Sequence, residues 1–137
     1  MAKAKAFSFI ILDINDFKSI NDTYGHDYGD NVIKAVAEVI KKSFGKHYTC
    51  YRFGGDEFSI IGFETNQEKI ECQLKTMIKN FDEIRKQGIP LPTISYGYSI
   101  YRGKTNPYFE KIFKEADDQM YRFKKIRKAY VPERENV

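Results

Sequence analysis

The chain contains a nearly uninterrupted apolar run that ends on a carboxylate, from Phe7 to Asp13. Such a run is typical of a β-strand that is buried on both faces, because alternate side chains then point into two apolar layers. At about six apolar residues, the run is too short for a signal core or a bilayer crossing. It therefore predicts a central strand in a sheet that is packed against helices.

Helix-like and strand-like segments alternate after this run, with no linker, repeat or low-complexity block between them. Apolar residues recur at helical spacing in three segments, and two short strand-like segments flank a Gly-Gly pair. The predicted elements are a helix over 29–44, hairpin strands over 51–53 and 58–61, a helix over 70–84, a strand over 93–101 and a last helix over 109–123. The last helix is expected to turn Phe109, Ile112, Phe113, Ala116, Met120 and Phe123 inward and to expose Lys114, Lys125 and Lys128.

This order predicts a single domain over residues 1–137, of the α/β (α+β) class, with a mixed central sheet flanked by helices. A crossover through a helix should make the first strand parallel to the first hairpin strand. The end of the first strand at Asp13 and the turn at 54–57 would then share one edge of the sheet, where such folds bind ligands.

Charge and cysteine content narrow the function class. Cys50 lies in a strand-like segment and Cys72 in a helix-like one, without metal-ligand spacing, which favours a reducing, cytoplasmic setting. The net charge of +4 is modest, and basic and acidic residues are interspersed except near 122–128. This charge is compatible with a phosphate-bearing partner without requiring one, and we expect no nucleic acid and no membrane contact from this segment.

The sequence Gly54-Gly55-Asp56-Glu57 has two interpretations. A Gly-Gly pair between two strands is a common hairpin connection, and acidic residues at a turn face water. Alternatively, paired carboxylates at a ligand-binding edge form a site. The polar segment 12–30 is open in the same way, since its Asn and Asp residues are also ordinary in turns and helix caps.

Considered together, "DINDFKSINDTYGHDYGD" at 13–30 and "GGDEF" at 54–58 resemble the GGDEF family of diguanylate cyclases. The matching positions are Asp13, Phe17, Lys18, Ile20, Asn21, Asp22, Gly25, His26, Gly29, Asp30, Arg52 and Gly54 to Phe58. The segments "ISYGYSIY" and "ADDQMYRFK" also resemble family motifs, so the resemblance covers most of the chain. It implies the palm-like fold shared by nucleotidyl cyclases and polymerases.

The resemblance implies condensation of two GTP molecules into cyclic di-GMP, with release of pyrophosphate, at the interface of a homodimer. It implies two Mg²⁺ or Mn²⁺ ions per half-site, which suit hard oxygen ligands. The implied ligands are Asp13, the carbonyl of Ile14, Asp56 and Glu57. Asp56, Glu57 and Lys18 are the implied catalytic residues, with Lys18 neutralising phosphate charge. Which carboxylate accepts the 3′ hydroxyl proton, if either does, stays open.

The residues implied to contact the nucleotide are Phe17, Asn21, His26, Asp30, Gly54, Gly55, Lys124 and Lys128. A carboxylate at Asp30 can accept from guanine N1–H and N2–H₂ together, and adenine would leave it unpaired, so we expect GTP rather than ATP. His26 either contacts substrate or braces the loop. The two glycines leave room for ribose and the α-phosphate beside the backbone.

The chain departs from the family pattern in several places, and one of them is Asn15, which stands where an aspartate is more common. The family's usual N-terminal D-x-L-T segment is absent from this sequence, and Lys128 stands at the position of a family arginine. Gly45 and Tyr48 stand where many members carry an R-x-x-D product-inhibition site, so we expect no feedback binding there. The alternatives are a weak or inactive GTP-binding regulatory module and, with less support from the acidic cluster, a nucleic-acid binder.

Overall fold

The computed structural model describes residues 5–103 and 109–130, with the side chains of the last helix described as far as 126. In this part of the chain, four strands form one sheet in the order β2-β3-β1-β4. The strands are β1 (Phe7–Ile14), β2 (Tyr48–Arg52), β3 (Glu57–Gly62) and β4 (Ile94–Tyr101). The helices are α1 (Phe17–Tyr24), α2 (His26–Phe44), α3 (Gln67–Lys86) and α4 (Phe109–Tyr130), with a short 3-10 turn η1 (Gly45–His47) before β2.

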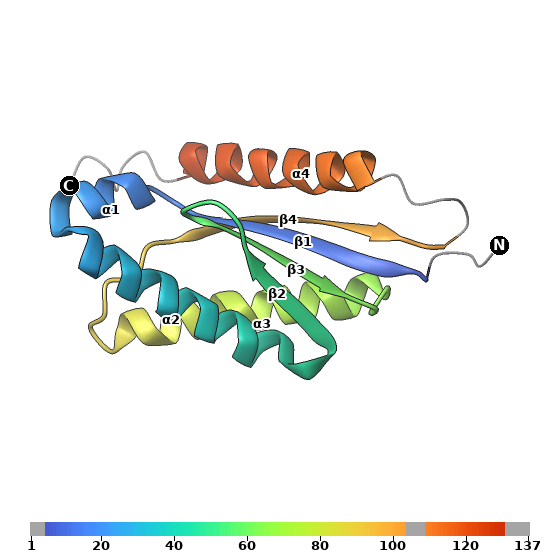
Figure 1. Ribbon diagram of the computed structural model, residues 1–137, viewed down its shortest axis with the longest axis horizontal. Coiled ribbons are helices and arrows are strands. Elements are labelled where there is room, and N and C mark those ends of the chain that lie inside the picture. The colour runs from blue at the N-terminus through green and yellow to red at the C-terminus, as the bar shows by residue number, and fades with distance from the viewer. Residues whose placement is uncertain (1–4, 104–108, 131–137) are drawn as a thin grey trace.

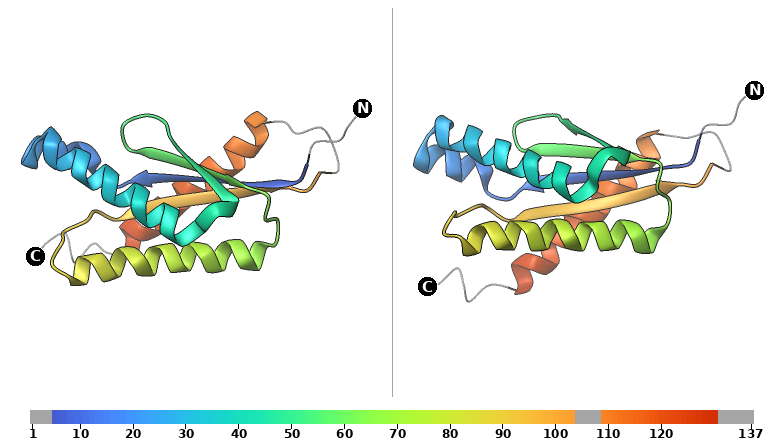
Figure 2. Two further views of the ribbon diagram at one scale, coloured as in Figure 1. Left: turned by 60° about the horizontal axis from the view of Figure 1, so that its bottom comes forward. Right: turned by 90° about the horizontal axis from the view of Figure 1, so that it is seen from below.

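The elements form three layers, with α4 on one face of the sheet and α2 and α3 on the other (Figure 1 and Figure 2). Side chains of β1 alternate between the two faces: Ile10 and Leu12 join the core under α2 and α3, whereas Phe9 and Ile11 join the core under α4. The prediction of a central strand buried on both faces is therefore confirmed, as is the helix-flanked α+β fold.

The strand order differs from the crossover argument in one respect. β1 and β2 run in the same direction, as expected, but β3 lies between them and pairs antiparallel with both. β4 also pairs antiparallel with β1, so every neighbouring pair in the described sheet is antiparallel, and the prediction of a mixed sheet was wrong in this respect. The reason is that the returning strand of the hairpin, β3, is the more apolar of the two and takes the central position beside β1.

The polar segment after β1 folds as a helix rather than as an extended loop. Asp16, in the left-handed region at φ 58°, turns the chain out of β1 into α1. Phe17 and Ile20, three residues apart, pack on the core, and their spacing explains why so polar a segment is helical. Gly25, with φ 91°, then separates α1 from α2, which begins at His26 and not at Gly29 as predicted.

The inward face of α4 agrees with the prediction except at its beginning. Ile112, Ala116 and Met120 are buried, and Lys114 and Lys125 are exposed. Phe109 was expected inside but exposes 54% of its surface, because it lies in the first turn of the helix, with one edge against Phe9. Phe113 and Phe123 are half-buried, and the side chain of Lys128 lies outside the described residues.

Candidate active site

Two carboxylates from different strands lie on the sheet face that α4 covers. In the β1–β3 ladder, Asp13 is the register partner of Glu57, and the nitrogen of Ile14 donates to the carbonyl oxygen of Asp56 at 3.0 Å. Asp13 is two residues from Ile11, which packs under α4, so its side chain belongs to the same face. The predicted meeting of Asp13 with the hairpin turn at one edge of the sheet is confirmed.

Two hydrogen bonds within the turn between β2 and β3 hold it in shape. The nitrogen of Phe53 donates to the carbonyl of Glu57 at 3.0 Å, and Arg52 Nη2 donates to the carbonyl of Gly55 at 3.1 Å. Gly54 has φ 75°, which favours glycine. A Cβ added at Gly54 or Gly55 would meet no atom of the described residues within 4 Å, so this part of the turn surface is open to a ligand.

The surroundings of Asp56 and Glu57 disfavour the ionised forms of both side chains. Burial, followed by the proximity and charge of the Asp13 carboxylate, raises the pKa of Asp56 above its ordinary value. Burial, followed by the charges of Asp13 and Asp56, raises the pKa of Glu57. Both carboxylates are half-exposed, so an added cation can reach them from solvent. This is the electrostatic situation that a bound divalent cation relieves.

A lysine from α4 completes this group. Lys124 Nζ donates to Asp13 Oδ2, and the ion pair joins residues that are 111 positions apart in the chain. The positive charge of Lys124 partly offsets the rise in the pKa of Asp56 and Glu57, which remains the net effect. Lys124 was predicted as a phosphate contact, whereas here its partner is a carboxylate. The other oxygen of Asp13, Oδ1, is buried and has no hydrogen-bond partner in the described part of the chain.

These residues fit a magnesium ion with hard oxygen ligands. A buried carboxylate oxygen without a partner is costly, and a cation at Asp13 Oδ1 would remove that cost. Asp56 and Glu57 offer further oxygens next to it. No group of three or more His, Cys, Asp or Glu side chains within residues 5–103 and 109–130 is arranged to hold a metal by itself. The remaining ligands would come from backbone, water and substrate.

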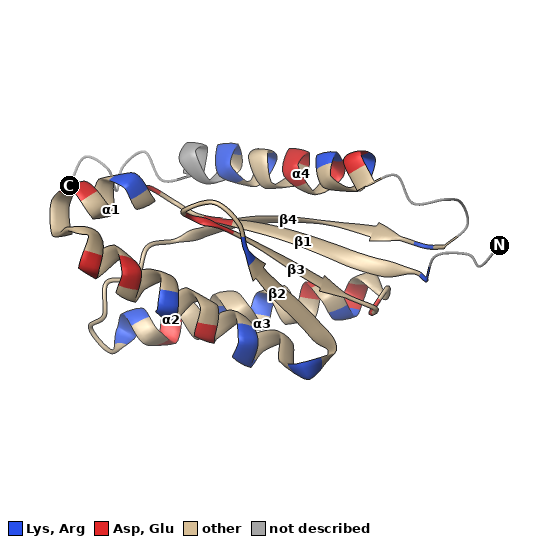
Figure 3. Ribbon diagram, in the orientation of Figure 1, with Lys and Arg blue, Asp and Glu red and all other residues tan. Residues whose placement is uncertain are grey.

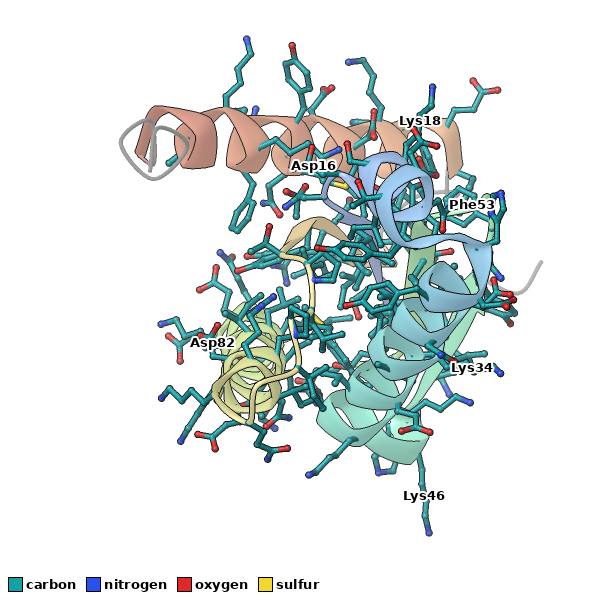
Figure 4. The ribbon with its side chains drawn as sticks, turned by 90° about the vertical axis from the view of Figure 1, so that its left-hand side faces the viewer. Asp16, Lys18, Lys34, Lys46, Phe53 and Asp82 are labelled. Carbon is teal, nitrogen blue, oxygen red and sulfur yellow. The ribbon has the colours of Figure 1, made fainter. Side chains whose placement is uncertain are left out.

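The other predicted site residues lie on α1 and at the start of α2. Asn21 packs against Gly29, where any Cβ would strike the Asn21 amide, and its Oδ1 is buried without a partner in the part of the chain that is described. Asp30, His26 and Lys18 are exposed. Figure 4 shows Lys18 projecting outward from α1. Phe17 is buried in the core beneath them, so it supports the helices from below.

Sequence reasoning missed one acidic neighbour of the site. Asp117 of α4 contributes to the raised pKa of Glu57, after burial and the two aspartates. The signal was available, since Asp117 and Lys124 are seven residues apart and so lie on one side of a helix, two turns from each other.

Asn15, which follows β1, has a structural contact. Its side-chain amide donates to Thr93 Oγ1 at 3.0 Å and accepts from Ser95 Oγ at 2.9 Å, and these bonds connect the end of β1 with the beginning of β4.

Charges elsewhere on the surface are mixed. Lysines and arginines are interspersed with acidic residues along α2, α3 and the first half of α4, whereas the described second half of α4 carries only basic charges (Figure 3). Acidic residues gather where β1 ends and β3 begins. None of these patterns is the continuous basic stripe of a nucleic-acid binder. Among the helices of the described residues, none combines the length and the apolar character needed to cross a membrane.

Comparisons with known proteins identify the family to which the sequence is similar. The family model described as "Diguanylate cyclase, GGDEF domain" matches residues 1–129. Diguanylate cyclase DgcM of Escherichia coli is 32% identical over 124 residues, which is 90% of this chain and 30% of DgcM. The chain spans only 20% to 36% of the length of such curated relatives.

Two solved structures extend the agreement to three dimensions. The active GGEEF domain of a diguanylate cyclase from Vibrio cholerae superposes with a TM-score of 0.74 at 28% identity, over 88% of this chain and 78% of that one. The GGDEF domain of DgcB from Caulobacter crescentus, in complex with c-di-GMP, gives 0.74 at 27% identity, over 88% and 72%.

Proposed function

Because the chain belongs to the GGDEF family of diguanylate cyclase domains, we propose that it condenses two GTP molecules into cyclic di-GMP. The observation that carries the proposal is the register of β1 and β3, which sets Asp13 opposite Glu57, next to Asp56. A pair of neighbouring strands thus delivers three carboxylates to one edge, beside an open glycine turn. This arrangement suits phosphoryl transfer, in which positioning and charge neutralisation dominate.

In each half-reaction, the 3′ hydroxyl oxygen of one GTP forms a bond to the α-phosphorus of the other, and the bond from that phosphorus to the bridging oxygen breaks. Pyrophosphate leaves with the bonding electron pair, and the hydroxyl proton passes to Asp56, Glu57 or water. Two such steps close the ring. Because each domain carries one GTP, the reaction requires two copies of the domain that face each other, and we propose a homodimer.

We assign the metal position to Asp13, the carbonyl of Ile14, Asp56 and Glu57. Two Mg²⁺ or Mn²⁺ ions per half-site would supply charge neutralisation for the phosphates and for the attacking oxygen. Asp13 Oδ1, which has no hydrogen-bond partner within the described part of the chain, and the raised pKa values of the two turn carboxylates support this assignment. The residues of the chain hold the carboxylates in place through the β1–β3 ladder, before any ligand binds.

We assign the nucleotide to the space above the turn and α1. The open surfaces of Gly54 and Gly55 would receive ribose and α-phosphate. Lysines would neutralise the phosphates, and Asn21 with Asp30 would recognise guanine. The lysines are Lys18, Lys124 and Lys128. His26 would contact the nucleotide at its side, and the buried Phe17 would support α1 through apolar packing.

The test incubates the chain at high concentration with GTP and Mg²⁺ or Mn²⁺ and measures cyclic di-GMP and pyrophosphate by chromatography. Asp56→Asn should abolish product, whereas Asp118→Asn, an exposed acid of α4 that pairs with Lys114, should leave it unchanged. Product that persists in Asp56→Asn would refute the assignment. GTP binding without product, in a preparation shown to dimerise, would favour the regulatory module instead.

A further inference from the structure

Lys124 is the cation that neutralises Asp13 in the absence of a ligand. The ammonium donates to Asp13 Oδ2, and the side chains of the lysine and the aspartate are 32% and 12% exposed. Both charged groups are therefore largely withdrawn from water, where an ion pair with a hydrogen bond is stronger than one on the surface. The second oxygen of Asp13, Oδ1, is buried and has no hydrogen-bond partner among the described residues.

The packing of α4 fixes this contact. Ala116, Met120 and Lys124 are spaced four apart, so they lie along one side of the helix, and the first two are buried against the sheet. At Gly97 the helix backbone lies directly on β4, because an added Cβ would collide with Ala116 and Met120. Lys124 is thus the next residue on the helix side that packs against the sheet, and its ammonium contacts Asp13 while its backbone stays helical.

From this contact we infer that Lys124 and a divalent cation compete for Asp13, and that bound triphosphate ends the competition by attracting the lysine. The inference rests on the proposed function, which places metal and triphosphate at this edge. An ammonium and a metal ion on one carboxylate repel each other, so the cation binds weakly while Lys124 remains. When phosphates offer the lysine a second anionic partner, Asp13 becomes available. Nucleotide and metal then strengthen each other's binding, and by the same factor.

Lys124 is in this sense a positioning residue whose partner changes. Its effect on metal affinity should have opposite signs in the two states of the domain. Without nucleotide, the lysine should weaken metal binding. With nucleotide, it should support metal binding, because it helps to hold the phosphates that supply further metal ligands. A lysine that only contacted phosphate would show the second effect and not the first.

The experiment measures Mn²⁺ binding through the electron paramagnetic resonance signal of free Mn²⁺, with and without guanosine 5′-(α,β-methylene)triphosphate, which cannot be cyclised. The variants are Lys124→Met and, as a charge control one residue along the helix, Lys125→Met, whose ammonium lies over the exposed Tyr121 ring. Lys124→Gln serves as a second variant if the methionine variant fails to fold. Thermal unfolding verifies that each variant is folded.

Without nucleotide, Lys124→Met should bind Mn²⁺ about tenfold more tightly than the wild type, the scale of one partly buried charge-assisted contact. Lys125→Met should change the affinity less than about twofold. The analogue should tighten Mn²⁺ binding in the wild type and do so less in Lys124→Met. Equal nucleotide-free affinities in the wild type and both Lys124 variants would overturn the inference. A wild type that binds no analogue would refute the proposed function instead, whatever the Mn²⁺ affinities are.

Discussion

Replacing Gly97 by alanine should destabilise the protein through the packing of α4 on β4. The new Cβ would lie 2.5 Å from the nitrogen of Met120, and closer still to the carbonyl oxygen of Ala116. Ordinary contact begins near 3.4 Å, so the helix must move away by roughly 1 Å. The obstacle is helix backbone, so no side-chain rotation relieves it.

The size of the effect follows from what the helix buries. A gap of about 1 Å costs a quarter to a half of the dispersion energy of each contact, and the face includes Ile112, Ala116 and Met120, each at most 6% exposed. Overpacking typically costs about 1–3 kcal/mol, and the lower flexibility of alanine in the unfolded chain returns less than about 1 kcal/mol. We expect a net loss of about 1–2 kcal/mol, or about 5 °C in Tm for a chain of this length.

Urea denaturation followed by circular dichroism measures this loss. Gly55→Ala is the matched control, because an added Cβ there meets no atom within 4 Å. If Gly97→Ala lost less than about 0.5 kcal/mol with an unchanged m-value, α4 would have room over β4, and the reasoning about close approach would be wrong.

Four further predictions concern the turn, the metal, pH and a loop anchor. Gly55→Ala should keep its Tm within about 2 °C but lose at least about tenfold in cyclic di-GMP synthesis, because the methyl group enters the proposed substrate space; a product assay beside a thermal melt checks both. Asp56→Asn should raise Tm in EDTA, since burial and a neighbouring carboxylate disfavour its charge, and should have a lower Tm than the wild type in saturating Mg²⁺. Burial and the hydrogen bond to Glu71 raise the pKa of Tyr98 from 10.0 to about 12, so the free energy of unfolding should fall as pH rises between these values. Tyr98→Phe should reduce that fall in urea titrations and leave the part due to Tyr48 and Tyr96, whose pKa values burial also raises. Arg85→Met should cost about 2 kcal/mol in urea unfolding, because Arg85 donates at 2.8 Å and 2.6 Å to two carbonyls in the connection between α3 and β4.

Local patterns were sufficient to locate most elements and to bring Asp13 to the hairpin turn. A nearly uninterrupted apolar run marks β1, because both of its faces are buried, and spacing by three and four marks α2 and α3, because each buries one face. Strand order was not accessible in the same way. Whether β2 or β3 lies beside β1 depends on which hairpin strand buries more apolar surface against distant helices, and that is a property of the whole sheet.

The site shows the same division between local and long-range information. The carboxylates of the turn could be named from the motif, but the partner of Asp13 could not, because Lys124 is 111 residues away and its usual interpretation on a helix is a solvated charge. The helix α1 was missed for a related reason, since Phe17 and Ile20 are its main core contacts among polar neighbours. Phe109 was misplaced because periodicity does not tell where a helix meets the end of its sheet.

The register of β1 against β3 makes the site depend on the accuracy of folding as well as on its stability. In an antiparallel ladder, a slip of one residue turns every side chain of a strand to the opposite face. A slipped β1 would turn Asp13 away from α4 and into the apolar core under α2 and α3. It would also remove Phe9 and Ile11 from the core under α4. Both cores would be disrupted by the same error that separates the carboxylates. A chain that is paired wrongly is therefore unstable as well as inactive, and a population of folded molecules should contain few with a misassembled site.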